Sequence, residues 1–140
     1  MRKPIQPKVH GIIDYTTSSA VAMAPKLLDM PRRAAALCYG LAGGYTALSM
    51  LTKYPAGAKK LVPFKAHGAA EAVIGAALPF MPHLMHFGNQ KKARNFFYGL
   101  TAMTAAVALM TDWNGTTATG QQRKRSRRRK RRGALAHMAA

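Results

Sequence analysis

The chain has few acidic residues and a single cysteine, and both shortages exclude classes of function. Four residues are Asp or Glu against 22 that are Lys or Arg, which gives a net charge of +18 over 140 residues. Because Cys38 is the only cysteine, an intrachain disulfide is excluded and a thiolate metal site is not expected. The sequence also lacks a nucleophile motif, a phosphate-binding glycine loop and a Cys/His finger, so no enzymatic activity is predicted.

The positive charge is concentrated near the C-terminus. Nine of the ten residues from 123 to 132 are basic, namely Arg123, Lys124, Arg125, Arg127, Arg128, Arg129, Lys130, Arg131 and Arg132. We expect residues 114–140 to form a disordered polybasic tail, because they carry too little apolar surface to fold alone. The tail is predicted to contact anionic lipid headgroups. The alternative is nonspecific nucleic-acid binding through phosphates, although no aromatic residue interrupts the basic run to stack on bases.

The remaining residues, 1–113, contain apolar stretches from which charge is nearly absent. They predict four helices, at about 9–28, 34–51, 66–85 and 93–111. The eighteen residues of 34–51 hold no charge, and as a helix they measure roughly 27 Å, close to the bilayer hydrocarbon core of about 30 Å. The predicted fold class is therefore all-α, a four-helix transmembrane bundle with the bilayer as its main partner.

Residue types return at fixed spacing, which predicts that residues 1–113 are a tandem repeat of one helical hairpin. The first repeat spans about 9–54 and the second about 66–113. At an offset of 57 residues, His67, Gly68, Glu71, Pro82 and Leu84 match His10, Gly11, Asp14, Pro25 and Leu27. At an offset of 59 residues, Tyr98-Gly99-Leu100 and Met110-Thr111-Asp112-Trp113 match Tyr39-Gly40-Leu41 and Leu51-Thr52-Lys53-Tyr54.

The second and fourth predicted helices carry small residues at spacings of three to four, namely Ala36, Gly40, Gly43, Gly44, Ala47, Gly99, Ala102 and Ala106. Small faces allow close helix approach in lipid, and here they also suggest a homo-oligomer. With four spans, one side of the membrane carries sixteen basic residues and the other side six, which places both termini in the cytoplasm. Tyr54 and Trp113, at equivalent helix ends, are expected in an interfacial aromatic belt.

Two pairs of ionisable residues stand inside the predicted helices. His10 and Asp14, like His67 and Glu71, are four residues apart and so share a helix face. Two histidines and two carboxylates can bind zinc, iron or manganese, and they can also relay protons. The structural alternative is a polar cluster in which each carboxylate accepts a hydrogen bond from the histidine of its own helix. His83 and His86 beside Met81 and Met85 form a weaker candidate, either a copper site or a plain loop.

The order of these landmarks resembles a known family. The pattern P-x-x-H-G-x-x-D-Y, at Pro7, His10, Gly11, Asp14 and Tyr15, opens the first predicted helix, and Pro25 stands near the end of that helix. The pattern L-T-x-Y-P-x-G, at Leu51, Thr52, Tyr54, Pro55 and Gly57, precedes a second P-x-x-H within residues 63–67. Over about residues 5–113 the chain is similar to the small bacterial SPW-repeat membrane proteins, although the motif that names them keeps only its proline, at 24–26 and 81–83. The resemblance implies a two-repeat, multi-pass protein of the bacterial inner membrane without an assigned activity.

Overall fold

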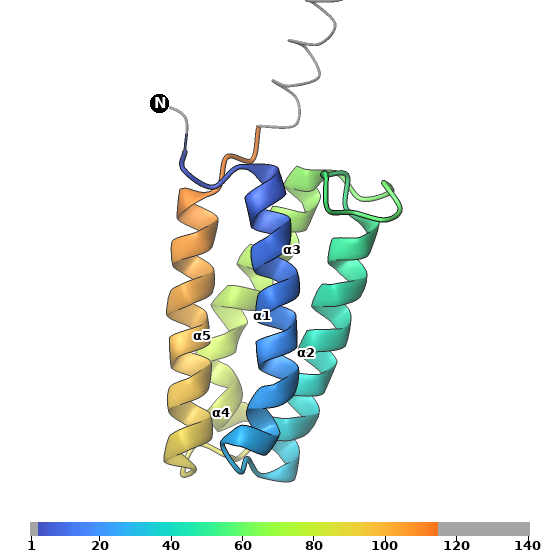
Figure 1. The fold of residues 1–140 in the computed structure, drawn as a ribbon. Coiled ribbons are helices and arrows are strands. Elements are labelled where there is room, and N and C mark those ends of the chain that lie inside the picture. Colours follow the sequence, from blue (N-terminus) through green and yellow to red (C-terminus); the bar gives the residue numbers. More distant parts are fainter. Residues whose placement is uncertain (1–2, 115–140) are drawn as a thin grey trace, which may run out of the picture.

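Four long helical stretches form a bundle in the computed structural model, which describes residues 3–114 (Figure 1). The elements are α1 (Pro7–Leu27), α2 (Arg32–Leu51), α3 (Phe64–Ala77), the short 3-10 helix η1 (Leu78–Phe80), α4 (Met81–Leu84) and α5 (Lys91–Met110). The described residues contain no strand, so the predicted all-α class is confirmed. The predicted tail and its nine basic residues lie outside the described residues.

Prolines account for two differences from the predicted helices. Helix α1 begins at Pro7 rather than at residue 9, because a proline at the first helical position loses no hydrogen bond. The helical stretch predicted over about 66–85 is present as α3, η1 and α4, which follow one another without a gap, but the chain tightens to a 3-10 turn over residues 78–80. Pro79 and Pro82 each lack the backbone N–H that a regular α-helix needs there.

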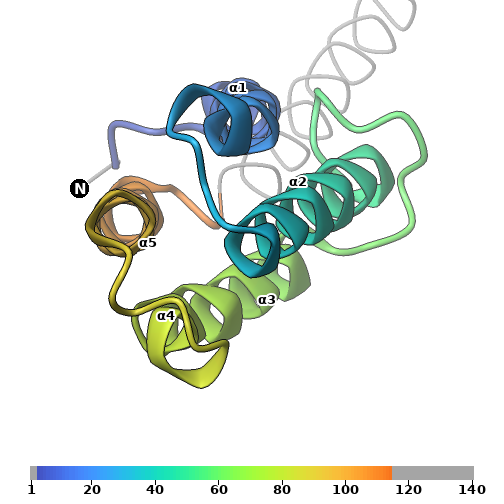
Figure 2. The same ribbon diagram turned by 90° about the horizontal axis from the view of Figure 1, so that it is seen from below.

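The helices pack as two antiparallel hairpins, with α1 beside α2 and α3 beside α5 (Figure 2). The described chain begins and ends at one end of the bundle, and the two hairpin turns lie at the other (Figure 1). At the end near the termini, short extended segments brace the residues that follow α2 and α5. The N–H of Lys53 donates to the carbonyl of Val62 at 2.8 Å, and the N–H of Asp112 donates to the carbonyl of Ile5 at 2.8 Å.

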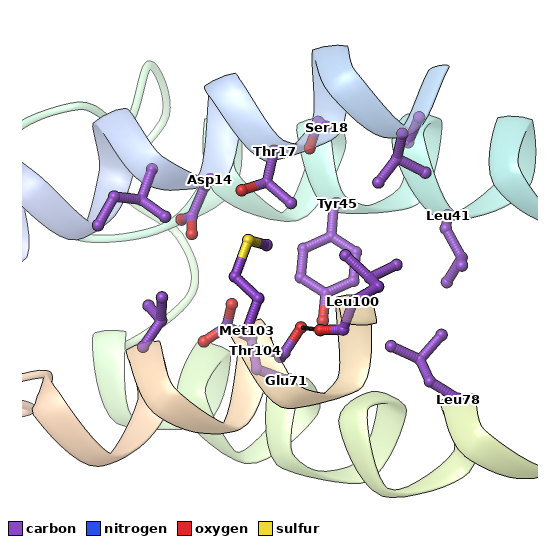
Figure 3. Close-up of a pocket in the computed structure, with 14 residues that line it drawn as sticks. Asp14, Thr17, Ser18, Leu41, Tyr45, Glu71, Leu78, Leu100, Met103 and Thr104 are labelled. Atoms are coloured by element: carbon purple, nitrogen blue, oxygen red, sulfur yellow. Dashed lines mark hydrogen bonds between the residues drawn. The ribbon is translucent and has the colours of Figure 1, made fainter. Parts of the chain in front are cut away.

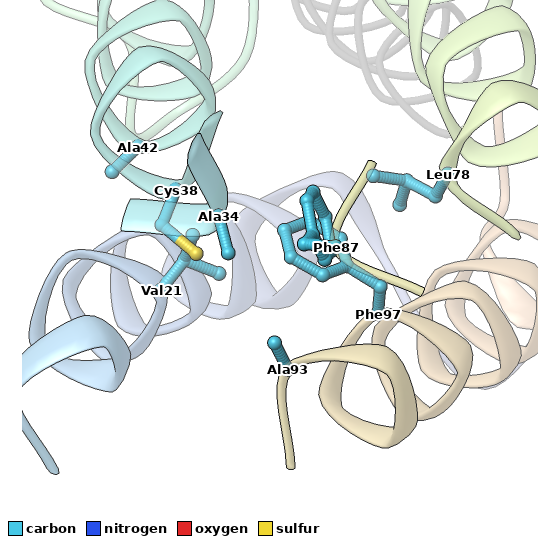
Figure 4. Packing of buried hydrophobic residues seen from close by; sticks show 8 residues of the cluster. All are labelled: Val21, Ala34, Cys38, Ala42, Leu78, Phe87, Ala93 and Phe97. Atoms are coloured by element: carbon cyan, nitrogen blue, oxygen red, sulfur yellow. The ribbon is translucent and has the colours of Figure 1, made fainter. Parts of the chain in front are cut away.

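The apolar core occupies the end with the hairpin turns. Its buried members come from α1, α2, η1, α5 and the turn before α5, namely Val21, Ala34, Cys38, Ala42, Leu78, Phe87, Ala93 and Phe97 (Figure 4). Cys38 is fully buried there and behaves as a small hydrophobic residue. Towards the termini the bundle interior is polar instead.

Among the described helices, α2 is the one that is long and apolar enough to cross a membrane by length and composition. The small residues of α2 and α5 lie on the outside of the bundle. A methyl group added at Gly40, Gly43, Gly44 or Gly99 would meet nothing within 4 Å. The predicted small faces therefore do not bring helices together within the chain.

Gly11 and Gly68 have the opposite environment, because each is covered by an aromatic ring. A Cβ atom at Gly11 would lie 2.5 Å from Tyr54 Cε2, and one at Gly68 would lie 2.7 Å from Trp113 Cζ3. Tyr54 is only 1% exposed, so its predicted place in an interfacial belt was wrong. Because the glycine after each histidine has no side chain, an aromatic ring can pack directly against the helix backbone there.

Replacing Gly11 or Gly68 by Ala is expected to lower the free energy of unfolding by about 1–3 kcal/mol, because the added methyl overpacks the ring. In helices such a change normally stabilises, by up to about 1 kcal/mol. Gly43→Ala is the matched control and should leave the thermal midpoint unchanged or raise it. Thermal unfolding followed by circular dichroism measures the difference, and equal effects of Gly11→Ala and Gly43→Ala would contradict it.

Candidate metal centre

Four ionisable side chains meet between α1 and α3 at the end of the bundle near the termini. They are His10, Asp14, His67 and Glu71, all buried, and one ligand atom from each lies within 4.8 Å of the others. The four-residue spacing puts both groups of a pair on one helix face, and the parallel course of α1 and α3 places the two pairs at the same level. The structure thus brings together all four residues that the sequence predicted.

The contacts cross between the helices as well as running along them. His10 Nε2 lies 3.3 Å from Asp14 Oδ1 on its own helix and 3.3 Å from Glu71 Oε2 on α3. His67 Nε2 lies 3.4 Å from Asp14 Oδ2 and 3.9 Å from Glu71 Oε1. None of these approaches has hydrogen-bond geometry, and both Nε2 atoms are buried without a hydrogen-bond partner. The two imidazoles therefore face a shared space rather than a single carboxylate.

Two threonines fix which ring nitrogen carries the proton. Thr111 Oγ1 lies 2.9 Å from His10 Nδ1, and Thr52 Oγ1 lies 2.8 Å from His67 Nδ1. Each hydroxyl already donates to a helix carbonyl, at 2.6 Å, so its oxygen is left to accept. Both histidines therefore carry a proton on Nδ1, which leaves the Nε2 lone pair of the neutral ring free to bind a ligand.

Each threonine comes from the other hairpin. Thr111 follows α5 and holds a histidine of α1, whereas Thr52 follows α2 and holds a histidine of α3. The extended segments around Ile5 and Val62 pair with the backbone at these two threonines and so set their positions. The same contacts that orient the rings also join the hairpins.

The two carboxylates differ in their surroundings. Asp14 Oδ2 accepts hydrogen bonds from Tyr54 Oη at 2.9 Å and from Ser49 Oγ at 3.2 Å. Burial raises the pKa of the Tyr54 phenol, so its proton stays available for donation. Glu71 Oε2 has no hydrogen-bond partner. The residues that the repeat would place there are Ala108 and Trp113, and Trp113 Nε1 donates to the carbonyl of Ala108 at 3.0 Å instead.

The buried charge of the site calls for a compensating cation. Among residues 3–114, no Lys or Arg side chain pairs with Asp14 or Glu71. With neutral histidines the cluster would carry two negative charges, and burying unpaired charge is costly. Protons on the site or one divalent cation must balance them.

Aromatic rings close the site towards the end of the bundle near the termini. The ring of Trp113 lies 4.9 Å from that of His10 and 4.8 Å from that of Phe64, measured between centroids. Phe64 also stacks on Tyr54 at 5.6 Å. This cover keeps water from the histidine side of the cluster.

The second sequence candidate does not gather into such a site. His83 is exposed in α4 and His86 is exposed in the turn between α4 and α5, and His83 Nε2 lies 3.3 Å from the hydroxyl of Tyr98. Within the described part of the chain, the four-residue cluster is the one group of three or more His, Cys, Asp or Glu placed to hold an ion.

Sequence reasoning missed the supporting residues Thr52, Thr111, Ser49 and Tyr54. The signal for the threonines was available, since both occur at the offset of 59 within the quoted repeat. Ser49 has no such signal, because alanine stands at the equivalent position. Comparison with protein-family models, curated proteins and solved structures finds no match to this chain.

Thr52→Val or Thr111→Val is expected to reduce the free energy of unfolding by about 1–3 kcal/mol, because a buried Nδ1–H loses its acceptor. Thr101→Val is the matched control: its hydroxyl donates to the carbonyl of Phe97 at 2.8 Å in the same way, without a histidine contact. Denaturant unfolding measures the difference. Equal losses in all three variants would show that the threonine–histidine contacts contribute nothing.

Proposed function

We propose that this chain is an integral membrane protein whose helical bundle binds one divalent metal ion through His10, Asp14, His67 and Glu71. The observation that carries the proposal is the convergence of two Nε2 lone pairs and two carboxylates, all within 4.8 Å and all buried. Protonated histidines would pair with the carboxylates and form a structural polar cluster, whereas with neutral rings both Nε2 atoms and Glu71 Oε2 are left without hydrogen bonds and can bind a metal ion.

The spacing of the donors supports a site shared by the two pairs. His10 Nε2 lies 3.3 Å from one oxygen of each carboxylate, and His67 Nε2 lies 3.4 and 3.9 Å from the other oxygens. One ligand atom from each of the four residues lies within 4.8 Å of the others. Two ligand atoms about 2.0–2.1 Å from a zinc ion at the tetrahedral angle lie about 3.3–3.4 Å apart, so the side chains would draw together around a bound ion. The two positive charges of the ion would balance the two carboxylates.

The donor set favours a borderline divalent ion. Imidazole suits zinc and iron, carboxylate is the harder partner of manganese, and no thiolate is present to favour copper(I). The threonine hydrogen bonds to Nδ1 are the outer contacts that metal-binding histidines commonly make. Zinc and iron(II) therefore fit best.

Protein purified in mild detergent is expected to carry one equivalent of a first-row divalent metal per chain, measured by plasma mass spectrometry. The double variant His10→Ala/His67→Ala should lose it, because three-coordinate or weaker sites release the ion during purification. Zinc added after chelation should raise the thermal midpoint of the wild type alone, since a ligand that binds only the folded state stabilises it.

His83→Gln/His86→Asn is the matched control, with two imidazoles removed away from the cluster. Asn suits position 86, where the backbone φ is 57°. This variant should keep its metal. Wild-type protein without bound metal, and without a thermal shift on adding zinc, iron(II) or manganese, would rule out the proposal.

The surface of the bundle supports membrane insertion. Large apolar side chains are exposed along all the helical stretches, including Ile12, Tyr39, Val73, Phe80 and Leu109. The charged residues in the middle of the stretches are Asp14 and Glu71, and both are buried, while the lysines and arginines stand near helix ends. A belt without exposed charge is what lipid requires.

Helix α1 is polar in sequence, but several of its polar groups are buried or bond to the backbone of the same helix. Asp14 and Ser18 are buried, and the exposed hydroxyls of Thr16 and Ser19 donate to the carbonyls of Ile12 and Tyr15 within the same helix, at 2.8 and 2.9 Å. Hydroxyls bonded in this way are tolerated in lipid. Hydropathy averaged along the sequence underrates α1 for this reason.

The basic residues support an orientation with both termini in the cytoplasm, and the run 123–132 then lies beside the anionic leaflet. The resemblance to the SPW-repeat proteins remains a prediction and agrees with this arrangement.

The protein should stay in the membrane pellet after alkaline carbonate extraction. A variant with the nine basic residues of 123–132 changed to glutamine should stay there too, because the bundle and not the tail holds the chain in lipid. Release of the wild type would indicate a soluble bundle, and release of the glutamine variant alone would indicate peripheral binding through the tail.

A further inference from the structure

We infer that the metal centre is reactive rather than purely structural: Glu71 is an exchangeable ligand, and the pocket of about 40 Å³ beside it admits a short-chain monocarboxylic acid that replaces Glu71 on the metal. The inference rests on the proposed metal site and adds the class of molecule that reaches it.

The asymmetry between the carboxylates indicates which ligand exchanges. Asp14 is held by two neutral donors, Tyr54 and Ser49, and its two oxygens approach both histidines. Glu71 has no such donor, its Oε2 is buried without a partner, and its Oε1 lies at the longest of the four separations, 3.9 Å. A carboxylate without outer hydrogen bonds moves at least cost, because its departure breaks none.

A pocket between the four long helical stretches begins at these carboxylates and runs towards the apolar core (Figure 3). Asp14 and Glu71 line it, whereas His10 and His67 do not. Its walls are mainly apolar and include Val21, Leu78 and Leu100. Any molecule in this pocket thus reaches the metal on its carboxylate side, at the position where Glu71 stands.

Two hydroxyl groups in the pocket lack partners. Ser18 is 5% exposed, and its Oγ has no hydrogen bond; the hydroxyl of Tyr45 is likewise buried and unpaired. Both residues line the pocket, on α1 and α2 (Figure 3). Buried hydroxyls normally have a partner, so these two indicate a bound polar group among apolar walls.

A carboxylic acid satisfies these requirements together. The apolar walls would favour the neutral acid over its anion in the pocket. With a metal ion held by His10, Asp14 and His67, the carboxylate of the acid could take the place of Glu71 and its proton would pass to the Glu71 carboxylate, so the charge of the site would be unchanged. The hydroxyls of Ser18 and Tyr45 would then donate to the incoming carboxyl group.

The test uses the full chain in detergent with cobalt(II) in the site and propanoic acid as the probe. Propanoic acid is expected to change the visible absorption of the bound cobalt in a saturable way, whereas propanamide, of the same length, leaves it unchanged. The Ser18→Ala/Tyr45→Phe variant should bind cobalt as the wild type does but bind propanoic acid at least tenfold more weakly, because two hydrogen bonds are lost.

Ser19→Ala/Tyr39→Phe is the matched control, since it removes the same two hydroxyl types from exposed positions. It should respond to propanoic acid as the wild type does. An unchanged cobalt spectrum in wild-type protein that holds the metal would overturn this inference and leave the metal site standing. Equal responses of the two double variants would overturn it as well, and failure to bind cobalt at all would overturn both proposals.

The exchange of Glu71 can be tested separately by measuring the affinity of variants for cobalt. Glu71→Gln should weaken cobalt binding several times less than Asp14→Asn, because the fixed ligand contributes more than the exchangeable one. Equal losses from the two substitutions would show that the site holds its carboxylates equivalently, contrary to the inference.

Discussion

The hydrogen bonds from His10 to Thr111 and from His67 to Thr52 connect the two helical hairpins at the point where their polar groups meet. Each bond orients an imidazole and favours the tautomer with its proton on Nδ1. Each bond also connects a helix of one hairpin to the segment that follows a helix of the other. The hairpins share an apolar core only near their turns. At the other end of the bundle, polar contacts join the hairpins instead of an apolar core. The same histidines that make these contacts direct their two Nε2 lone pairs at two carboxylates.

This arrangement reverses the usual distribution of residue types. Among residues 3–114, eight polar or charged residues are buried, including the four of the cluster, while large apolar side chains such as Leu109 and Val73 are more than 70% exposed. In water, such a surface would drive association or unfolding, since exposed apolar area is unfavourable and buried charge is costly. In the proposed membrane setting the exposed apolar side chains would contact lipid, and the buried polar groups would be shielded inside the bundle. The proposed metal ion removes the remaining cost, because it replaces unpaired charge with coordinate bonds.

The sequence was sufficient for much of this architecture, since charge-free stretches and prolines mark helices well. The spacing of His10 with Asp14 and of His67 with Glu71 also predicted a shared face, and the parallel direction of the two helices brought the pairs together. The sequence could not show which residue each of these side chains contacts in the folded bundle. Tyr54 was expected at a membrane interface because aromatic residues at helix ends usually lie there, but a glycine on the neighbouring helix opened a place for its ring. The small residues of α2 were expected between helices, yet helix rotation about its axis, which depends on the whole bundle, turned them outwards.

The differences between the two halves are as informative as their likeness. A symmetric site with equivalent ligands on both helices would be closed and would serve structure alone. Here the positions that give Asp14 its hydroxyl donors carry Ala108 and Trp113 in the other half, so the donors to Glu71 are missing while the tryptophan ring still packs on Gly68. The packing role of the aromatic position is kept and its hydrogen-bonding role is not. In the proposed metal site, loss of donors on the side that faces the pocket would free one ligand without loosening the other three, and this is the arrangement that a site needs if it is to exchange a ligand repeatedly and keep its metal.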